Sequence, residues 1–473
     1  MILLGKRKNV YLISHLDVRS LILAESIRKK EATTKEKSII IFTNIARNDD
    51  SYSGLEKKAK KLGCKLTKND ICNISLKPYS VSLVRAVIIS PDENKNLETA
   101  LILAEEYKDK IESELYVFAS SKESECLLDS VDKGGHLGLI PPIKIRRVNV
   151  IRNQVYTDLL NNSMFDLAVE EYGEKVISVL IVGLGNYGME MLKSVLWCGQ
   201  MTGFVLRVTV IDENPNAEDL FYMQCPGIRE RGTQPQNGED YYEITFHSGV
   251  DVHSEKFNDI IKTVPNTTQV LVALGNEQQN LETALRLRSI FSGIQIDEGK
   301  TPSHSKKDVQ TPRITAVIAN HQKAQLLSKN MLSNFKEQYY NINCIASNAE
   351  LYSYENIFAS ELEKMALSAH LQWGDEKSFN NYEYFRRSSM ASAIHKKYRD
   401  ELINDEELAA MVEHTRWNAY MRAVEGYSFG FIRDDLALRH SSIIKYSSLA
   451  STEQAKDHRM NTYKLNTTKN KRE

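Results

Sequence analysis

The sequence predicts an α/β protein with two Rossmann-like domains, each a doubly wound parallel sheet, followed by a C-terminal, mainly α-helical domain. Three observations predict this fold class. Short apolar runs alternate with helix patterns over the first 350 residues, the second half of that stretch repeats the first, and strand patterns are absent after about residue 350. Parallel strands are short continuous apolar runs because helices cover both faces of their sheet. We therefore expect domains at 1–172, 173–350 and 351–473, the last with a core at about 375–460.

Strand and helix patterns alternate through the first unit. The expected helices run from about residue 16 to 30, over LEKKAKKLG (55–63), where Gly63 is a typical stop signal, and over LETALILAEEY (97–107). The expected strands are NVYLI (9–13), SIIIF (38–42), AVIIS (86–90), ELYVFA (114–119) and KIRRVNVI (144–151). This alternation indicates βαβ units with helices on both faces of a parallel sheet.

The second unit runs through the same order again. Its expected helices run from the end of the first strand to about Trp197 and over LETALRLRSIF (281–291). Its expected strands are ISVLIVG (177–183), FVLRVTVID (204–212), YYEITF (241–246), QVLVALG (269–275), ITAVIA (314–319) and INCIAS (342–347). Two polar insertions, at 229–240 and 297–312, are rich in Gly, Pro and charge and are expected to be surface loops, either disordered or acting as a lid or partner loop.

Two sequence matches support a duplication. NLETAL occurs at 96–101 and again at 280–285, each time after a strand pattern and at the start of a helix pattern. NVYLISHLDVRS, from Asn9, aligns with SVLIVGLGNYGM, from Ser178. Because the two matches occur in the same order and in the same structural positions, they indicate two copies of one Rossmann-like unit.

Composition narrows the class of protein. The 473 residues hold 61 basic and 62 acidic side chains, so a broad nucleic-acid-binding surface is not expected. Six cysteines are scattered without a C-x-x-C pair, which argues against a zinc site or a disulfide framework and indicates free thiols in a reducing compartment. No stretch approaches the roughly 18 apolar residues that span a bilayer. We expect a cytoplasmic protein without direct membrane insertion and without a metal.

The clearest motif is VLIVGLGNYGMEML, which places Gly183, Gly185 and Gly188 in G-x-G-x-x-G spacing between a strand and a helix. In such a loop the first glycine allows the tight turn, the second lets a pyrophosphate approach the backbone, and the third lets the helix pack against the sheet. The N-terminus of the helix then binds the phosphates through its N–H groups and dipole. The motif, with Asn186 and Tyr187 inside it, predicts binding of NAD or an adenine nucleotide; the alternative is a glycine-rich turn without a ligand.

Further candidates follow neighbouring strands of the second unit. Asp212 ends the second strand at about the position, roughly 20 residues beyond the loop, where a carboxylate binds the ribose of NAD. Gly275 and Asn276 follow QVLVAL, where the second loop of the crevice is expected. Asp251 follows YYEITF and is equally well explained as an exposed turn residue.

The first unit lacks this fingerprint. Ser14, Leu16 and Arg19 take the places of the three glycines, and Thr43 takes the place of the acidic residue. Leu16 puts a bulky side chain where phosphates need bare backbone. We therefore do not expect the first unit to bind a dinucleotide in the same way; it is expected to be a structural or dimerising partner, or to hold a different ligand.

Both units resemble the N-terminal nucleotide-binding domain of the regulators of potassium conductance, which also occurs in Trk-type potassium-uptake proteins. The matching stretches are GLGNYG (183–188), VID (210–212), GVD (249–251) and ALGNEQQNLETA (273–284), and the resemblance is clearest for 178–290 and fainter for 9–150. It implies a domain that pairs as a homodimer, binds NAD, ATP or a similar ligand, and passes its binding state to a membrane channel or transporter.

The C-terminal region resembles the ryanodine-receptor repeat domain. The matching stretches are RRSSMASAIHKK (386–397), EELAAMVEHTRWNAYMRAVEGYSFG (406–430) and LRHSSIIKYSSLASTEQAKDH (438–458), with Tyr427 where the family often has Trp. Two interpretations are open for the polar residues here. Arg416 could clamp a phosphate, with Trp417 or Tyr427 as a stacking platform and His414 as a polar contact. Alternatively these residues, with His440 and Asp457, form a hydrogen-bonded network that supports the fold.

No catalytic motif accompanies these features. The sequence has no G-x-S-x-G elbow, no H-E-x-x-H and no G-x-x-x-x-G-K-[ST] loop, and we predict no catalytic residue. We expect a nucleotide-binding sensor or regulator whose ligand, NAD, an adenine nucleotide or a signalling nucleotide, controls a partner that acts in ion transport. The alternatives are an NAD-dependent oxidoreductase and a ligand-free scaffold in signalling or phage defence.

Overall fold

The computed structural model describes residues 8–34, 37–45, 50–74, 81–107, 113–121, 123–125, 144–229, 241–264, 266–298, 312–328 and 342–462. The predicted insertions at 229–240 and 297–312 lie almost wholly outside these residues, and the polar tail at 466–473 lies wholly outside them. The chain forms two compact units. The first comprises residues 1–153, 348–370 and 374–387, and the second comprises 154–347, 371–373 and 388–473.

The first unit is built on a six-stranded parallel sheet with the order β3-β2-β1-β4-β5-β6. Its strands are β1 (Lys8–Ile13), β2 (Ile39–Phe42), β3 (Lys65–Leu66), β4 (Val81–Ile88), β5 (Ser113–Phe118) and β6 (Lys144–Val148). Its helices are α1 (Val18–Thr34), α2 (Asp50–Lys61), α3 (Glu93–Tyr107), α12 (Asn348–Leu351), α13 (Tyr354–Phe358), α14 (Glu361–His370) and α15 (Glu376–Asn381). The order is that of a Rossmann sheet, in which the chain reverses direction between the first and fourth strands.

The second unit repeats this order as β10-β9-β8-β11-β12-β13, again all parallel, with β7 added antiparallel to β8. Its strands are β7 (Val169–Glu171), β8 (Glu174–Val182), β9 (Phe204–Asp212), β10 (Glu243–Ser248), β11 (Gln269–Val272), β12 (Arg313–Val317) and β13 (Ile342–Ile345). Its helices up to residue 328 are α5 (Val150–Asn161), α6 (Asn186–Cys198), α7 (Ala217–Gln224), α8 (Pro226–Arg229), α9 (Glu255–Thr263), α10 (Glu277–Asp297) and α11 (His321–Ser328). The predicted α/β fold class with two Rossmann-like sheets is therefore confirmed.

The repeated NLETAL motif has the same structural role in both sheets. Asn280, 2% exposed, accepts a hydrogen bond from the Leu274 N–H through Oδ1 (2.6 Å) and donates one through Nδ2 to the carbonyl of Val317 (2.9 Å). Asn96 makes the matching pair of bonds in the first unit, at 2.9 Å each. Each asparagine thus ties the loop after the fourth strand to the end of the fifth strand. This buried cross-link gives a physical reason for both copies to carry the motif.

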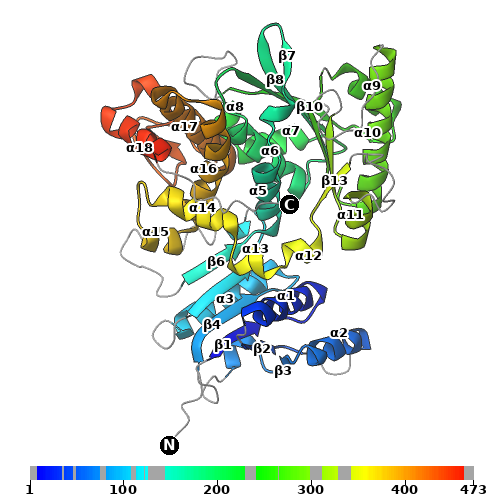
Figure 1. Cartoon of the computed structure of the whole chain (residues 1–473), viewed down its shortest axis with the longest axis vertical. Helices are drawn as coiled ribbons and strands as arrows, with labels where there is room; N and C mark the ends of the chain where they lie inside the picture. The colour runs from blue at the N-terminus through cyan, green and yellow to red at the C-terminus, as the bar shows by residue number, and fades with distance from the viewer. Residues whose placement is uncertain are drawn as a thin grey trace, which may run out of the picture. The chain divides into compact units, whose positions relative to one another are not determined.

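The C-terminal helical region is part of the second unit from residue 388. It contains α16 (Glu383–Leu402), α17 (Glu406–Tyr420), a π-helical turn (Met421–Glu425), the short strands β14 (Ser428–Phe429) and β15 (Arg439–His440), and α18 (Ser451–Thr462). In Figure 1 these elements, drawn in orange to red, lie beside α6 and α8.

Helix α6 is buried on its outer as well as its inner face. All residues from Glu190 to Cys198 are buried, including the charged Glu190 and Lys193. A helix on an open Rossmann sheet normally leaves a polar stripe to solvent. Here α17 and the π-helical turn cover that stripe, and the Lys193 ammonium donates to Gln224 Oε1 at 2.9 Å. Across the described ranges, no helix has both the length and the apolar character needed to cross a membrane.

Candidate functional site

The glycine loop lies at the point where the strand order of the second sheet reverses. β8 pairs with β9 on one side and with β11 on the other. The loops that follow β8 and β11 therefore leave the carboxyl edge of the sheet next to each other, in opposite directions. This is the crevice in which Rossmann folds bind their ligands.

Gly183 and Gly188 are required by the packing of the loop itself. Gly183 has φ +92°, and a Cβ there would lie 2.5 Å from the carbonyl oxygen of Ala273. A Cβ on Gly188 would lie 1.9 Å from the carbonyl oxygen of Gly183. Both distances are far below any permitted contact. These two glycines let the loop turn against β11 and let α6 approach the loop, as their positions in the motif predict.

Gly185 is different, because the protein's own packing does not require a glycine there. Its φ is −66°, it is exposed, and a Cβ would have its nearest neighbour, the oxygen of Ala273, at 4.0 Å. Gly185 is also the N-cap of α6 and provides no capping side chain. In the same unit Ser254 and Asn276 do cap α9 and α10 with their side-chain oxygens. The bare backbone at Gly185 suits an anionic group from outside the chain.

Asp212 lies at the end of β9, where the motif predicts a carboxylate, and it is half-buried. Its Oδ2 accepts a hydrogen bond from the Leu184 N–H at 2.5 Å, and its Oδ1 accepts one from the Asn214 N–H at 2.7 Å. The carboxylate thus fixes the glycine loop to the end of β9. A carboxylate has about four acceptor positions, so two remain for the hydroxyls of a ribose.

Gly275 and Asn276 lie on the opposite side of the crevice, after β11. Gly275 has φ +79°, which only glycine adopts readily. The side-chain oxygen of Asn276 caps α10 by accepting from the N–H groups of Gln278 and Gln279, at 2.9 and 3.2 Å. Asn276 therefore shapes the loop through a helix cap. Of the remaining loop residues, Asn186 is exposed and Tyr187 is half-buried in the first turn of α6.

Asp251 follows β10 and is exposed. Its Oδ1 accepts from the backbone N–H of His253 at 2.8 Å and lies 3.0 Å from Nδ1 of the same residue. These two hydrogen bonds to His253, the backbone one first, lower the pKa of Asp251. This geometry is that of an exposed turn, the alternative that the sequence left open for this residue.

The sequence analysis missed Glu277, the first residue of α10. Its carboxylate accepts from the Asn320 N–H at 2.9 Å and from the Lys323 ammonium at 2.8 Å, and so links the loops after β11 and β12. The hydrogen bond from Lys323 is the main reason that its pKa is lowered. Glu93 occupies the same place before NLETAL in the first unit and accepts from Ser120. A comparison of the two copies one step before the shared motif would have found this pair.

In the first unit the equivalent of the phosphate site is filled by side chains. Asp17 caps α1 by accepting from the Ser20 N–H at 2.9 Å, and it forms an ion pair with Arg19 at 2.6 Å. Leu16 is 1% exposed, so its bulk lies inside the fold. The Ser14 hydroxyl accepts from the N–H of Ile89 at 2.8 Å, and Thr43 is likewise buried. A carboxylate at this helix N-terminus opposes the binding of a phosphate.

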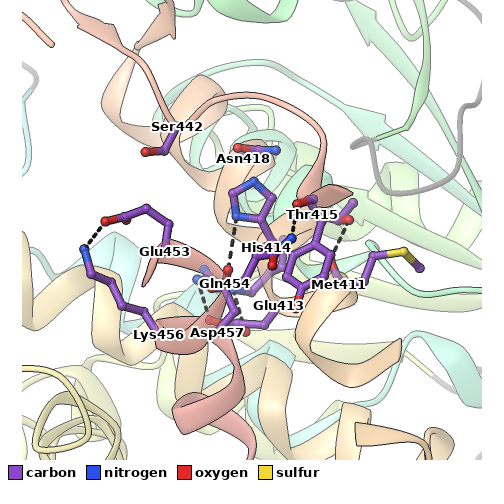
Figure 2. Close-up of polar contacts among 12 residues, drawn as sticks. Met411, Glu413, His414, Thr415, Asn418, Ser442, Glu453, Gln454, Lys456 and Asp457 are labelled. Carbon is purple, nitrogen blue, oxygen red and sulfur yellow. Dashed lines mark hydrogen bonds and ion pairs between the residues drawn. The ribbon is translucent and has the colours of Figure 1, made fainter. Parts of the chain in front are cut away.

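The candidates in the helical region fall into two groups on different faces of α17. Arg416 is 1% exposed and donates to Glu413 through Nη2 (2.9 Å) and Nε (3.2 Å). His414 lies on the other side, where Nε2 is 2.9 Å from the carbonyl of Ile444 and Nδ1 is 3.3 Å from Asp457 on α18. Figure 2 shows His414 and Asp457 facing each other. These contacts tie α17 to its neighbours.

Trp417 and Tyr427 extend this second group into a row of aromatic rings. The Trp417 ring is stacked on His414, with centroids 5.7 Å apart, and meets the edge of His440 at 5.1 Å. Tyr427 lies 6.3 Å from His440 and donates from its hydroxyl to Asp435 at 3.1 Å. The structure thus brings His414, Trp417 and Tyr427 together around His440, while Arg416 points into a separate cluster.

In the part of the chain that the structure describes, no three His, Cys, Asp or Glu side chains are grouped so that they could hold a metal ion. No protein-family profile matches the sequence, and no curated protein matches it. Among solved structures, the chain is similar to a glycosyltransferase from Rickettsia africae, with 10% identity, 85% of this chain and 100% of that chain covered, and a TM-score of 0.21. It is also similar to a dipicolinate synthase from Bacillus halodurans, with 13% identity, 63% of this chain and 88% of that chain covered, and a TM-score of 0.19. Similarity at this level carries no functional inference, and the Rossmann-like assignment rests on the strand order and loop geometry of this chain.

Proposed function

We propose that this protein is a nucleotide-binding regulator whose ligand, NAD, an adenine nucleotide or a signalling nucleotide, binds at the glycine loop of the second unit. The observation that carries the proposal is Gly185. It is exposed, lacks a steric reason to be glycine, and leaves the N-terminus of α6 without a capping side chain. The diphosphate lies against this bare backbone, where the N–H groups and dipole of α6 favour negative charge.

The surrounding residues divide the remaining work of binding. Gly183 and Gly188 keep the loop close to β11 and α6. Asp212 orients the loop through the Leu184 N–H and accepts hydroxyl groups of the ribose. Because a carboxylate repels a 2′-phosphate, this arrangement favours an unphosphorylated ribose.

Helix α6 supplies a physical link between the ligand and the helical region. Its first turn lies at the crevice, and its last turn carries Trp197, which is completely buried. The Trp197 ring meets the edges of Tyr156 and Tyr420, with centroids 5.4 and 6.4 Å apart. Nε2 of His395, on α16, is 2.7 Å from the carbonyl oxygen of Gln200, just beyond the end of α6. A ligand that binds one position of α6 more tightly than another therefore shifts the packing of α16 and α17.

The resemblance to the regulators of potassium conductance and to the ryanodine-receptor repeat suggests the output. The proposed protein is a cytoplasmic homodimer that acts on a membrane channel or transporter. Its first unit serves as a structural or dimerising partner, because Asp17 occupies the N-terminus of its own α1. The helical region acts as the output module or as a second ligand-binding module.

The experiment has two parts, both on the full chain. The small molecules released when the purified protein is denatured are identified by mass spectrometry, and thermal unfolding is followed with NAD, ATP and ADP-ribose at millimolar concentrations. The proposal predicts a co-purifying or stabilising nucleotide that is recovered unchanged after incubation. Turnover of NADH would instead favour the oxidoreductase, and the absence of stabilisation by any nucleotide would favour the scaffold.

A further inference from the structure

A second cluster of charged side chains is buried where α16 and α17 pack on α6. Arg399, from α16, and Arg416, from α17, are 0% and 1% exposed. Both donate to the carboxylate of Glu413, which is 3% exposed and also accepts from the Ser392 hydroxyl at 2.8 Å. This cluster plays no part in the proposed nucleotide site.

The cluster carries more positive than negative charge. Glu413 is ionised, because Arg416 and Arg399 outweigh the effect of burial and hold its pKa at about 2. His395 lies beside Arg399 but is neutral near pH 7, because burial and then the charge of Arg399 lower its pKa to about 3. Two guanidinium groups thus face one carboxylate. An uncompensated buried charge costs several kcal/mol, so a second anion is expected.

The neighbouring carboxylates are engaged elsewhere. Asp400 accepts two hydrogen bonds from Lys396, at 2.7 and 2.8 Å, and so balances that ammonium. Asp457, whose electrostatic effect extends to Arg416, is hydrogen-bonded to His414 on the other face of α17. Neither carboxylate supplies an acceptor to the remaining guanidinium N–H groups.

Those N–H groups identify the chemistry of the missing partner. Within the described residues, Arg399 Nε and Nη2 and Arg416 Nη1 are inaccessible to solvent and have no acceptor, and neither has the indole Nε1 of Trp197 on α6. Every one of these atoms is a donor. A water molecule could accept two such bonds but would then have to place its own two hydrogens among donors. An anion accepts all of them and cancels the excess charge. Asn418 Oδ1 is an unpartnered acceptor, but it lies two residues beyond Arg416, and residues at that spacing do not face each other on a helix.

We propose that the junction of α6, α16 and α17 binds a small monovalent inorganic anion of the halide class, held by Arg399 and Arg416. The anion is a structural component that enters as the helical region closes on α6. It accepts from the two guanidinium groups on the side away from Glu413. This proposal is independent of nucleotide binding and is tested without a nucleotide.

The direct test is crystallographic. Crystals of the full chain are grown with sodium bromide as the only halide, and anomalous data are collected at the bromine absorption edge. The expected result is a bromide peak within hydrogen-bonding distance of both Arg399 and Arg416. A well-ordered junction that holds water or no density there, with bromide only at surface positions, would mean an adventitious ion only and would overturn the proposal.

A solution test uses matched salts. Thermal unfolding of the full chain is measured in sodium chloride and in sodium gluconate at equal ionic strength. The expected result is a higher Tm in chloride, with a rise that saturates as chloride increases. Arg399→Met should remove the dependence on chloride, whereas Arg229→Met, at an exposed arginine of α8, should retain it. An equal Tm in both salts contradicts the proposal; if Arg399→Met does not fold, the bromide experiment on the native chain decides.

Discussion

Replacement of Gly185 by valine separates the binding of a nucleotide from the stability of the fold. The Cβ of the new residue would have its nearest neighbour at 4.0 Å, and the backbone at φ −66°, ψ −166° is extended, which valine tolerates. Exchanging glycine for a residue without a capping side chain at a helix N-cap costs at most about 1 kcal/mol. The same Cβ and its methyl groups occupy the space that the diphosphate needs. We therefore expect the unliganded protein to keep nearly all of its stability and to lose its affinity for the ligand.

The expected size of the effect follows from mass action. A nucleotide at 100 times its Kd stabilises the native state by about 2.7 kcal/mol. For a unit of roughly 150–250 residues, each kcal/mol corresponds to about 2–4 °C in Tm, so the native chain should gain roughly 5–11 °C. Gly185→Val should gain less than about 1 °C at the same concentration if its affinity falls by more than a hundredfold.

The assay is differential scanning fluorimetry with and without the nucleotide identified by mass spectrometry. Gly293→Val is the matched control, because Gly293 lies within α10 and a Cβ there also meets nothing within 4 Å. The control should respond to the nucleotide as the native chain does. A full ligand-induced shift in Gly185→Val would refute the assignment of the diphosphate to this loop.

Four further predictions follow from individual contacts. Gly188→Ala should lower stability by at least about 1–3 kcal/mol in chemical denaturation, because its Cβ would lie 1.9 Å from the Gly183 oxygen; an unchanged midpoint would contradict this geometry. Asn280→Ala should cost about 1–3 kcal/mol by leaving the Leu274 N–H without its buried acceptor, and Asn96→Ala should do the same in the first unit. Trp197→Ala should cost about 3–5 kcal/mol, because the ring is completely buried, and a loss below 1 kcal/mol would show that α6 is not packed as described. Burial first of all lowers the pKa of His395 to about 3, so the folded state stays neutral there while the unfolded state binds a proton below its ordinary pKa of 6.5. Stability should therefore fall from about pH 6.5 toward pH 3, and His395→Gln should flatten this decline in urea titrations at pH 7 and pH 5.

The sequence predicted the two sheets well, because parallel strands buried on both faces leave continuous apolar runs. The strand cores from Val10 and from Leu180 onward lie in the predicted places, and both sheets have the same order. The shared NLETAL stretch was recognised as a repeat, but its reason, the buried asparagine that joins two loops, needed the three-dimensional contacts.

The surroundings of α6 could not be predicted from local sequence. Its pattern gives no sign that Glu190 and Lys193 are buried, because the layer that covers them comes from residues more than 200 positions later in the chain. The sequence likewise placed Arg416 beside His414 and Trp417 as one group. On the helix these residues point to different sides, so Arg416 joins Arg399 and Glu413 while His414 joins Asp457.

The most direct test is a crystal structure of the full chain grown with saturating NAD or ATP. If the second unit is the sensor, the diphosphate lies against the backbone from Gly185 to Gly188, with the ribose near Asp212. A nucleotide bound elsewhere, or a crevice filled by the protein's own side chains at saturating ligand, would contradict the proposed function.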